Sequence, residues 1–320
     1  MAQPSICLVT PALAKANNGN WQTASRWARF LGADYRVRVV ERWDGAAADL
    51  MIALHARRSA ASVADWAAQM VRRPLVLVLT GTDLYRDIAI DADARRSLAL
   101  ADTLIVLNEH AIADLPAEHR AKGVVCIQSA PRRARLGKTE LRLRALMVGH
   151  LREEKSPQTF FDAARLLAGR DDIVLDHVGA ALDPSLGAQA RALARSNPQY
   201  RWLGALPHRN TRARIQRAHV LVHASRIEGG AHVVIEAVTS GTPVLASRIP
   251  GNTGLLGQGY RGVFEPGDAQ GLAALLQRCR DDPDMLPDLM QQCDARAAAF
   301  EPARERAVLL DLIRRTLETR

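Results

Sequence analysis

Two glutamates, Glu228 and Glu236, are the carboxylates in this sequence whose spacing best suits chemistry. Glu228 stands directly before the glycine pair Gly229 and Gly230, and Glu236 lies further along the segment that follows. An ionised carboxylate only accepts hydrogen bonds, and its two oxygens suit the vicinal diol of a ribose. Because a carboxylate repels a phosphate, we expect Glu228 to accept hydrogen bonds from the hydroxyl groups of a sugar.

The segments around the glutamates must form the elements that position them. The apolar run 220–222 is typical of a buried parallel strand. Residues 231–239 are expected to form a helix that ends at Gly241, and residues 242–247 the next strand. Strand, glycine turn, helix and strand make one βαβ unit, and such units bind ligands beyond the carboxyl end of the first strand.

The start of the expected helix adds an anion site to the two carboxylates. The backbone N–H groups of Gly230, Ala231 and His232 would be free to bind an anion, most naturally a phosphate. A diol, a diphosphate and a sugar in line describe a nucleotide sugar. The alternative is an ordinary buried βαβ unit whose glutamates are solvated.

Length and composition set the class of protein. A chain of 320 residues with 48% hydrophobic content is long enough for two domains. No apolar run is long enough to span a bilayer, and the strand expected at 6–10 is not preceded by a charged signal-peptide region. Four cysteines without a C-x-x-C pair indicate a reducing compartment, the cytoplasm, and no structural zinc.

The net charge of +9 suits an anionic partner. Nucleic acid is the weakest choice, because no recognition motif is present and the basic residues are not interleaved with exposed aromatics. We expect neither nucleic-acid binding nor stable membrane insertion.

Apolar strands alternate with helices along the whole chain, which predicts an α/β fold of two doubly wound parallel sheets. In the first half, the expected strands are 6–10, 35–41, 50–54, 74–79, 103–107 and 124–127, and the expected helices are 21–31 and 59–71, the latter capped by Ser59. In the second half, the other expected strands are 144–148, 173–178, 201–203 and 262–264, and the other expected helices are 157–167 and 297–317.

A polar, basic run at 131–144 separates the two halves and predicts a linker with a solvated surface; a membrane or phosphate contact is the alternative. The expected organisation is a first Rossmann-like domain at 1–131, a linker at 132–143, a second such domain at 144–297 and a final helix at 298–320.

The string from Glu228 onward, EGGAHVVIEAVTSGTPVLAS, resembles the E-x7-E motif of GT-B glycosyltransferases, especially family 4. Gly230 replaces the usual aromatic residue and Ala231 the second glycine. The resemblance implies a GT-B fold with an interdomain cleft, and a last helix that crosses back to the first domain. It also implies a UDP-sugar donor, with Glu228 on the sugar and Glu236 on the ribose.

The segment 149–155, GHLREEK, resembles the G-R-L-x-x-x-K segment of the same family, whose basic residues neutralise the donor diphosphate. Lys155 matches this pattern. His150 stands at the usual arginine position, and Arg152 is the residue that can compensate. Without a metal, such cations offset the charge of the leaving group. The alternative is a charged surface loop.

Two first-domain loops resemble parts of the family that face the ligands. One is Asn17-Asn18-Gly19-Asn20, before the first helix; its alternative is a simple turn. The other is Thr80-Gly81-Thr82-Asp83, in the place of H-G-(S/T)-D, with Thr80 where the family has histidine. His55 is a substitute candidate for that imidazole, although a histidine at a strand end is more often structural. Asp83 can also be only a turn or cap residue.

No residues have the spacing of a metal site. Asp91 and Asp93 match D-x-D formally, but they lie in an expected helical stretch and are interpreted as a solvated helix start. His208, His219 and His223 are interpreted as surface or packing residues. We expect no metal and no cofactor.

A narrower resemblance is carried by NNGNWQTASRW at 17–27, LTGTDLYRDI at 79–88 and SRIEGGAHVVIEAV at 225–238. These strings resemble the selenosugar synthases of selenoneine biosynthesis. The resemblance implies transfer of N-acetylglucosamine from its UDP donor to selenophosphate, with release of UDP and loss of phosphate, which gives a 1-selenosugar. A selenium nucleophile arrives deprotonated, so the histidine missing at Thr80 is tolerable. Catalysis would rest on Lys155, Arg152 and Glu228, with the loops 17–20 and 80–83 holding the acceptor.

Three other functions fit the same motifs. The first is a family-4 transferase with a lipid or sugar acceptor at a membrane surface. The second is a UDP-sugar 2-epimerase on the same fold, which needs no acceptor. The third is a nucleotide-binding module without activity.

Overall fold

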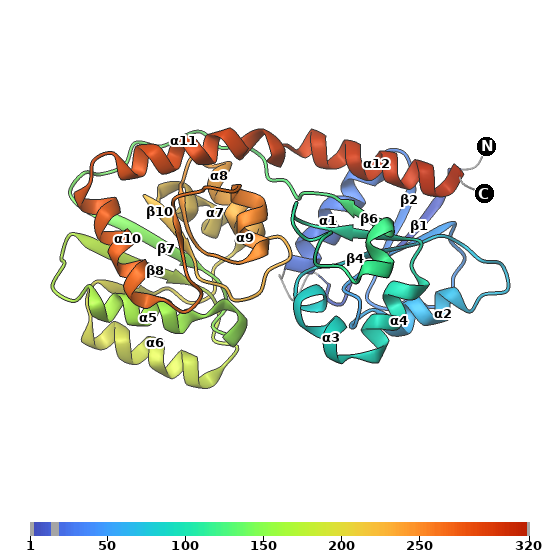
Figure 1. Ribbon diagram of the computed structural model, residues 1–320, viewed down its shortest axis with the longest axis horizontal. Coiled ribbons are helices and arrows are strands. Elements are labelled where there is room, and N and C mark those ends of the chain that lie inside the picture. Colours follow the sequence, from blue (N-terminus) through green and yellow to red (C-terminus); the bar gives the residue numbers. More distant parts are fainter. Residues whose placement is uncertain (1–2, 14–18, 319–320) are drawn as a thin grey trace. The chain divides into compact units, whose positions relative to one another are not determined.

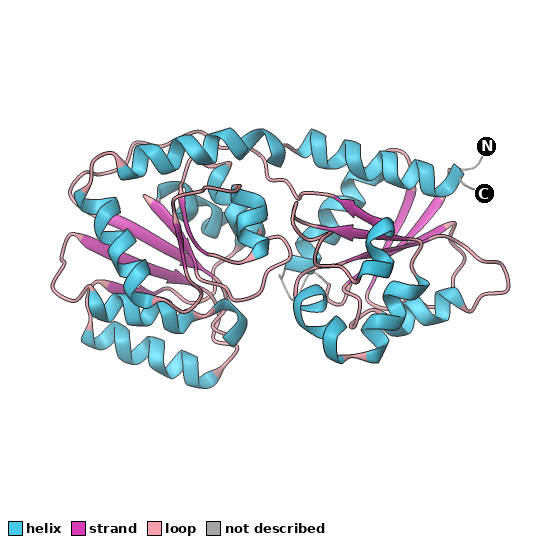
Figure 2. Cartoon of the chain, in the orientation of Figure 1, coloured by secondary structure: helices cyan, strands magenta, loops and turns pink. Residues whose placement is uncertain are grey.

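The computed structural model describes residues 3–13 and 19–318, which form two compact units (Figure 1). The first unit contains the chain up to residue 128, residues 228–230 and the segment from residue 302 onward. The second unit contains residues 129–227 and 231–301. In each unit a sheet lies among helices (Figure 2).

The first unit is built on a parallel six-stranded sheet with the order β2-β1-β3-β4-β5-β6. Its strands are β1 Ser5–Val9, β2 Arg36–Val40, β3 Leu50–Leu54, β4 Leu75–Val78, β5 Thr103–Val106 and β6 Gly123–Val125. Its α-helices are α1 Gly19–Leu31, α2 Ala60–Ala67, α3 Ile88–Ile90, α4 Ala92–Leu100 and α12 Pro302–Glu318, and it also has a π-helical segment at Asp83–Asp87 and a 3₁₀ helix at Ala117–Lys122.

Both faces of the first sheet are buried, as in other parallel sheets. The two faces of β3 show this most simply, because alternate residues of a strand point to opposite sides. Met51 packs in one core with the side chains of α2 and α4. Ile52 packs in the other with Trp27 of α1 and Ile313 of α12. The apolar run of β3 therefore follows from burial on both sides.

A buried carboxylate ties α12 to α1 within the first unit. Glu305 is 1% exposed and accepts hydrogen bonds from Arg26 Nε at 2.9 Å and from Trp27 Nε1 at 2.7 Å. A buried charge is tolerated when it is paired and hydrogen-bonded in this way. The last helix is thus part of the first unit in spite of its place at the end of the chain.

The second unit is built on another parallel six-stranded sheet, with the order β12-β11-β10-β7-β8-β9. Its strands are β7 Leu143–Val148, β8 Ile173–Val178, β9 Tyr200–Trp202, β10 Val220–His223, β11 Val244–Ser247 and β12 Val263–Phe264. Its α-helices are α5 Pro157–Leu166, α6 Pro184–Ser196, α7 His208–Arg217, α8 His232–Val238, α9 Pro250–Leu256, α10 Ala269–Asp281 and α11 Met285–Ala297.

The predicted α/β class with two doubly wound parallel sheets is confirmed. The prediction for α2 is wrong in two details. The helix covers Ala60–Ala67 and not 59–71, and Ser59 does not cap it with its side chain. The Ser59 hydroxyl instead donates to the backbone oxygen of Leu54 at 2.6 Å, because the serine is buried at the end of β3.

Candidate functional site

The strand order of the second sheet marks a candidate ligand site at the carboxyl ends of the neighbouring strands β7 and β10. The chain runs from β7 outward to β9, and then returns to place β10 on the other side of β7. Ligands of open α/β sheets bind at such a reversal, beyond the carboxyl ends of the strands. Two loops leave the sheet at this point, 149–156 after β7 and 224–231 after β10. These two loops contain Lys155 and Glu228.

A backbone hydrogen bond joins the two loops. The N–H of Arg226 donates to the oxygen of Glu154 at 2.8 Å. Lys155 ends the 3₁₀ turn Glu153–Lys155, and its side chain lies along Gly149, where an added Cβ would be 3.5 Å from Lys155 Cγ. The reversal of strand order therefore brings the lysine loop next to the chain that leads into Glu228.

The glycine after β8 is a steric requirement of the lysine loop. A Cβ on Gly179 would lie 1.9 Å from the oxygen of Gly149. The buried imidazole of His177 also donates from Nε2 to this oxygen at 3.2 Å. These contacts fix the backbone where β7 passes into the loop.

His150 and Arg152 differ in what they can offer an anion. Burial lowers the pKa of His150, and the charges of Arg152 and Lys155 lower it further, so this imidazole is neutral at neutral pH. Its Nδ1 accepts a hydrogen bond from the N–H of Ala180 at 3.0 Å. Arg152 keeps its charge and has its Nε 4.0 Å from Glu154 Oε2. Arg152, and not His150, is the second cation of this loop.

Glu236 is a buried anion at the centre of a basic cluster. It lies in α8 and is 4% exposed. Three basic groups approach its Oε1 most closely: His208 Nε2 at 2.6 Å, His232 Nδ1 at 3.5 Å and Arg212 Nη1 at 3.6 Å. Burial acts to raise the pKa of Glu236, but the hydrogen bond from His208 and the neighbouring positive charges hold it below its usual value. The carboxylate is therefore ionised at neutral pH.

As interpreted, His208 is a surface residue, with 47% of its side chain exposed. It begins α7 and donates to Glu236 in α8, a helix that packs on α7. Arg212 was absent from the predicted site, although it is 4% exposed and lies one turn after His208 on α7. The i, i+4 spacing of a histidine and an arginine on one face of a helix is the only signal that the sequence offers for this cluster.

The helix expected at 231–239 begins one residue later than predicted and ends at Val238. The helix starts at His232, with Ala231 as its N-cap, and it is seven residues long. Gly241 ends the segment with φ +68°, a conformation that favours glycine. The Nε2 of His232 donates to the backbone oxygen of Ser129 at 3.1 Å, because a carbonyl oxygen only accepts hydrogen bonds.

Residues 228–230 pack with the first unit, against the loop that contains Thr80 and Gly81. A Cβ on Gly229 would lie 2.6 Å from the carbonyl carbon of Thr80, and a Cβ on Gly81 would lie 2.6 Å from Gly229 N. Asn108 donates from Nδ2 to the oxygen of Gly229 at 2.7 Å. Two backbones approach this closely only where both residues are glycine.

Asp83 is enclosed by backbone N–H groups. It is 0% exposed, and its Oδ1 accepts from Thr80 and Gly81 at 2.9 and 2.8 Å, while Oδ2 accepts from Ala56 at 3.0 Å. These bonds hold the loop 80–83 in its shape. The geometry favours the turn-forming alternative for Asp83 over direct contact with an acceptor.

His55 directly follows β3 and has a left-handed conformation, with φ +75°. Its Nδ1 accepts from the N–H of Arg58 at 3.4 Å, so Nε2 carries the proton and donates to Thr82 Oγ1 at 3.1 Å. Burial lowers the pKa of His55, and the negative charge of Asp83, which acts to raise this pKa, does not outweigh the effect of burial. In this arrangement both ring nitrogens of His55 are engaged, Nδ1 with the N–H of Arg58 and Nε2 with the hydroxyl of Thr82.

The loop expected at 17–20 is described only in part. Asn18 lies outside the described residues, as does Asn17. Gly19 and Asn20 are the first two residues of α1, and the Thr23 hydroxyl donates to the oxygen of Gly19 at 2.9 Å. Among the residues that the structure describes, none has a heavy atom within 4 Å of a Cβ built on Gly19, so these residues do not require a glycine there.

The D-x-D segment is a helix start, as interpreted. Asp91 caps α4 and accepts from the N–H of Ala94 at 2.9 Å. In the described ranges, no group of three or more His, Cys, Asp or Glu side chains could hold a metal ion.

His219 packs between β7 and the preceding segment, where its Nε2 lies 2.8 Å from the oxygen of Thr139. None of the helices described is long and apolar enough to cross a membrane.

Two doubly wound units, with a glutamate-bearing βαβ turn at the strand-order reversal of the second, define a GT-B glycosyltransferase fold. Residues 128–299 match the family described as glycosyl transferases group 1. This match covers more than half of the 320 residues, and the chain belongs to that family.

Solved structures share this fold at low sequence identity. Sucrose-phosphate synthase from Thermosynechococcus elongatus is 16% identical, with a TM-score of 0.81 over 99% of this chain and 100% of that one. Anabaena HepE in complex with UDP and glucose is 16% identical, with a TM-score of 0.75 over 97% and 99%. S. aureus TarM in complex with fondaparinux, alpha-GlcNAc-glycerol and UDP is 13% identical, with a TM-score of 0.67 over 82% of this chain. The chain spans 55% of the length of TarM.

Proposed function

We propose that this chain transfers N-acetylglucosamine from a UDP-sugar to selenophosphate, as a selenosugar synthase. The donor half of the proposal rests on one observation above others. Glu236 is a buried, ionised carboxylate in the helix that follows the glycine turn of Glu228, at the strand-order reversal that also holds Lys155. Anabaena HepE, which shares the fold, is described in complex with UDP and with UDP-glucose.

Each donor group has a proposed partner. His208 holds Oε1 of Glu236, so Oε2 is the oxygen proposed for a ribose hydroxyl. The sequence suggested that both carboxylate oxygens of Glu236 would bind the ribose diol, whereas here only one of them is left for the ribose. Lys155 and Arg152 are proposed to bind the diphosphate, whose charge grows as the bond to the sugar breaks. Glu228 is proposed to accept from the sugar hydroxyls, and the turn at Gly229–His232 to lie along the donor.

The acceptor half rests on the resemblance of three strings and on the state of His55. Thr80 replaces the family histidine, and the imidazole of His55 has both nitrogens engaged. A hydroxyl acceptor needs a base to remove its proton, whereas selenophosphate arrives ionised. The loop with Thr80, Gly81 and Thr82, together with the region of Asn18, Gly19 and Asn20, is proposed to hold this anion.

Mass spectrometry of the products tests both halves. The purified chain is incubated with UDP-N-acetylglucosamine, with and without selenophosphate. A hexosamine mass with the isotope pattern of selenium, formed only when both are present, is the expected result. UDP release with lipid, sugar or thiophosphate acceptors, but never with selenophosphate, would refute the acceptor. An altered sugar formed from the donor alone would identify an epimerase, and no turnover with any acceptor would favour a binding module.

A further inference from the structure

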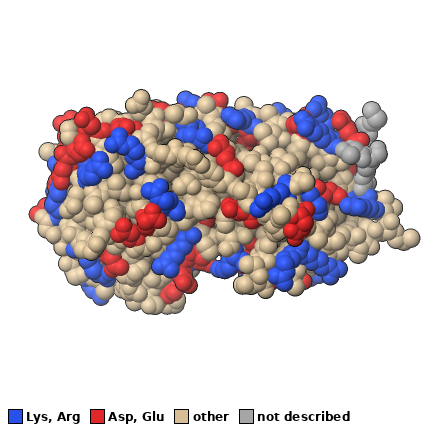
Figure 3. Space-filling model, in the orientation of Figure 1, with Lys and Arg blue, Asp and Glu red and all other residues tan. Residues whose placement is uncertain are grey.

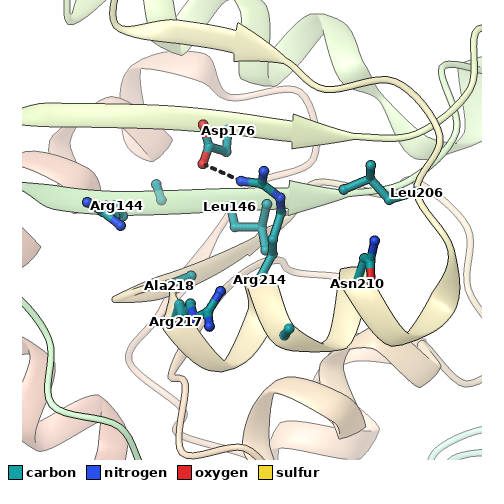
Figure 4. Close-up of a pocket in the computed structure, with 10 residues that line it drawn as sticks. Arg144, Leu146, Asp176, Leu206, Asn210, Arg214, Arg217 and Ala218 are labelled. Atoms are coloured by element: carbon teal, nitrogen blue, oxygen red, sulfur yellow. Dashed lines mark ion pairs between the residues drawn. The ribbon is translucent and has the colours of Figure 1, made fainter.

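A concave site lies in the second unit, between α7 and the strands β7 and β8 (Figure 4). Its volume is about 370 Å³, within the usual range for small-molecule sites. None of the residues assigned above to the donor or the acceptor lines it. Its lining residues are Arg144, Ala145, Leu146, Asp176, Leu206, Asn210, Ala213, Arg214, Arg217 and Ala218.

The periodicities of a strand and a helix bring these residues to one place. Leu146 of β7 pairs with Asp176 of β8, so the two side chains share one face of the sheet. On α7, residues 210, 213, 214 and 217 follow the i, i+3, i+4, i+7 spacing of a single helix face. Figure 4 shows Arg214 reaching from α7 toward Asp176 across the cavity.

The cavity carries a positive charge that its own residues do not neutralise. Asp176 is its one carboxylate, and Arg201 of β9 holds both oxygens at 2.6 and 2.9 Å. Arg214 Nη1 is 3.7 Å from Asp176, a weaker contact. Arg144 and Arg217 form no ion pair with any residue in the described ranges. Three arginines against one aspartate leave a net charge of +2 on the lining residues.

This concentration is local. Over the face of the chain in Figure 3, basic and acidic side chains are interspersed. Like charges brought together in a concave site are unfavourable unless an anion joins them. Guanidinium groups present paired N–H donors that match the oxygens of a phosphate.

We propose that this cavity binds a small phosphate ester with free hydroxyl groups, of the size of a hexose phosphate. Arg144 and Arg217 bind the phosphate, because neither guanidinium has an ion-pair partner among the residues that the structure describes. Asp176 and Asn210 accept hydrogen bonds from the hydroxyls, and the apolar atoms of Leu146 lie under the carbon skeleton. A phosphate ester without hydroxyl groups would form no hydrogen bonds with the carboxylate of Asp176 or the amide of Asn210.

Isothermal titration calorimetry at constant ionic strength tests the site, with glucose 6-phosphate as the probe. The variant combines Arg144→Ala and Arg217→Ala; both side chains are exposed, so the fold is retained. The matched control is Arg209→Ala, an exposed arginine on the same helix that does not line the cavity. We expect the double variant to bind roughly tenfold more weakly or worse, because charged hydrogen bonds are lost. The control is expected to bind like the parent chain.

Three further titrations test where the ester binds and which of its groups are recognised. Lys155→Ala is expected to leave the affinity for glucose 6-phosphate unchanged, since Lys155 does not line the cavity. Inorganic phosphate is expected to bind more weakly than the ester, and glucose not at all. The proposal is overturned if the parent chain does not bind the ester, or if the double variant binds it as the control does. Loss of binding in Lys155→Ala alone would assign the ester to the donor loop, and equal affinity for inorganic phosphate would refute the role of the hydroxyls.

Discussion

Removal of the charge of Glu236 is expected to destabilise the second unit before any question of catalysis arises. In Glu236→Gln, the guanidinium of Arg212 remains 4% exposed and loses the carboxylate 3.6 Å away. Burial already lowers the pKa of Arg212, which shows how poorly its charge is solvated there. Breaking a buried ion pair by removing one partner costs about 3–5 kcal/mol.

The lower end of that range applies here, about 3 kcal/mol. His208, the other strong partner of Glu236, has 47% of its side chain exposed, and it can bond to water when the carboxylate is gone. The hydrogen bond from Arg212 Nη2 to the oxygen of Pro131, at 3.0 Å, also remains. The dominant cost is therefore one buried, unpaired guanidinium.

A double-mutant cycle measures this cost. Glu236→Gln, Arg212→Met and the double variant are titrated with urea, and hydrogen exchange is followed in peptides from 220–247. The double variant removes both charges, so it is expected to be about 2 kcal/mol more stable than the sum of the single effects predicts. Glu265→Gln is the matched control: Glu265 pairs with Arg248 in the same unit, with 65% of its side chain exposed. Surface pairs of this kind contribute about 0–1 kcal/mol.

A cost for Glu236→Gln no greater than that for Glu265→Gln would refute the buried-charge penalty. Simple addition of the two single effects in the double variant would refute it too, because Arg212 would then not depend on Glu236 for its counter-charge. Acid should reproduce the loss. The pKa of Glu236 is lowered by folding, so its contribution is present above the unfolded pKa of about 4.3 and is lost as the pH falls through the folded value.

Three other predictions concern the lysine loop. Lys155→Ala should lower kcat about 10²-fold with saturating donor, as loss of one charge-stabilising donor does; an unchanged kcat would remove Lys155 from the leaving group. Burial lowers the pKa of His177 to about 4 from 6.5, so the chain should lose up to about 3 kcal/mol as the pH falls from 6.5 to 4, and this slope should be absent from His177→Gln. Gly179→Ala should destabilise the second unit by several kcal/mol, because the added Cβ would meet the oxygen of Gly149. The control Gly137→Ala, in open space, should change the stability by no more than about 0.5 kcal/mol. Equal stability of the two variants would show that the loop can shift.

The strands were predictable where burial alone decides the residue types. Residues 50–54, an apolar run, form β3 with the expected bounds, and residues 173–178 also form β8 as expected. Helix α7 was not predicted, because HRNTRARIQR has a single strongly apolar residue, Ile215, and so lacks the stripe by which an amphipathic helix is recognised. Its buried face instead carries Arg212, which is stable there only because Glu236 lies opposite.

The sequence by itself determined what depends on neighbours in the chain. The order of strands and helices, the glycine turn after Glu228 and the distance to Glu236 follow from local periodicity and from the conformational freedom of glycine. Only the tertiary structure decided which distant groups meet. Glu236 is joined to His208, 28 residues away, and Glu305 to Arg26, 279 residues away. Such pairs depend on how whole elements pack, and side-chain spacing along one element carries no information about its partner.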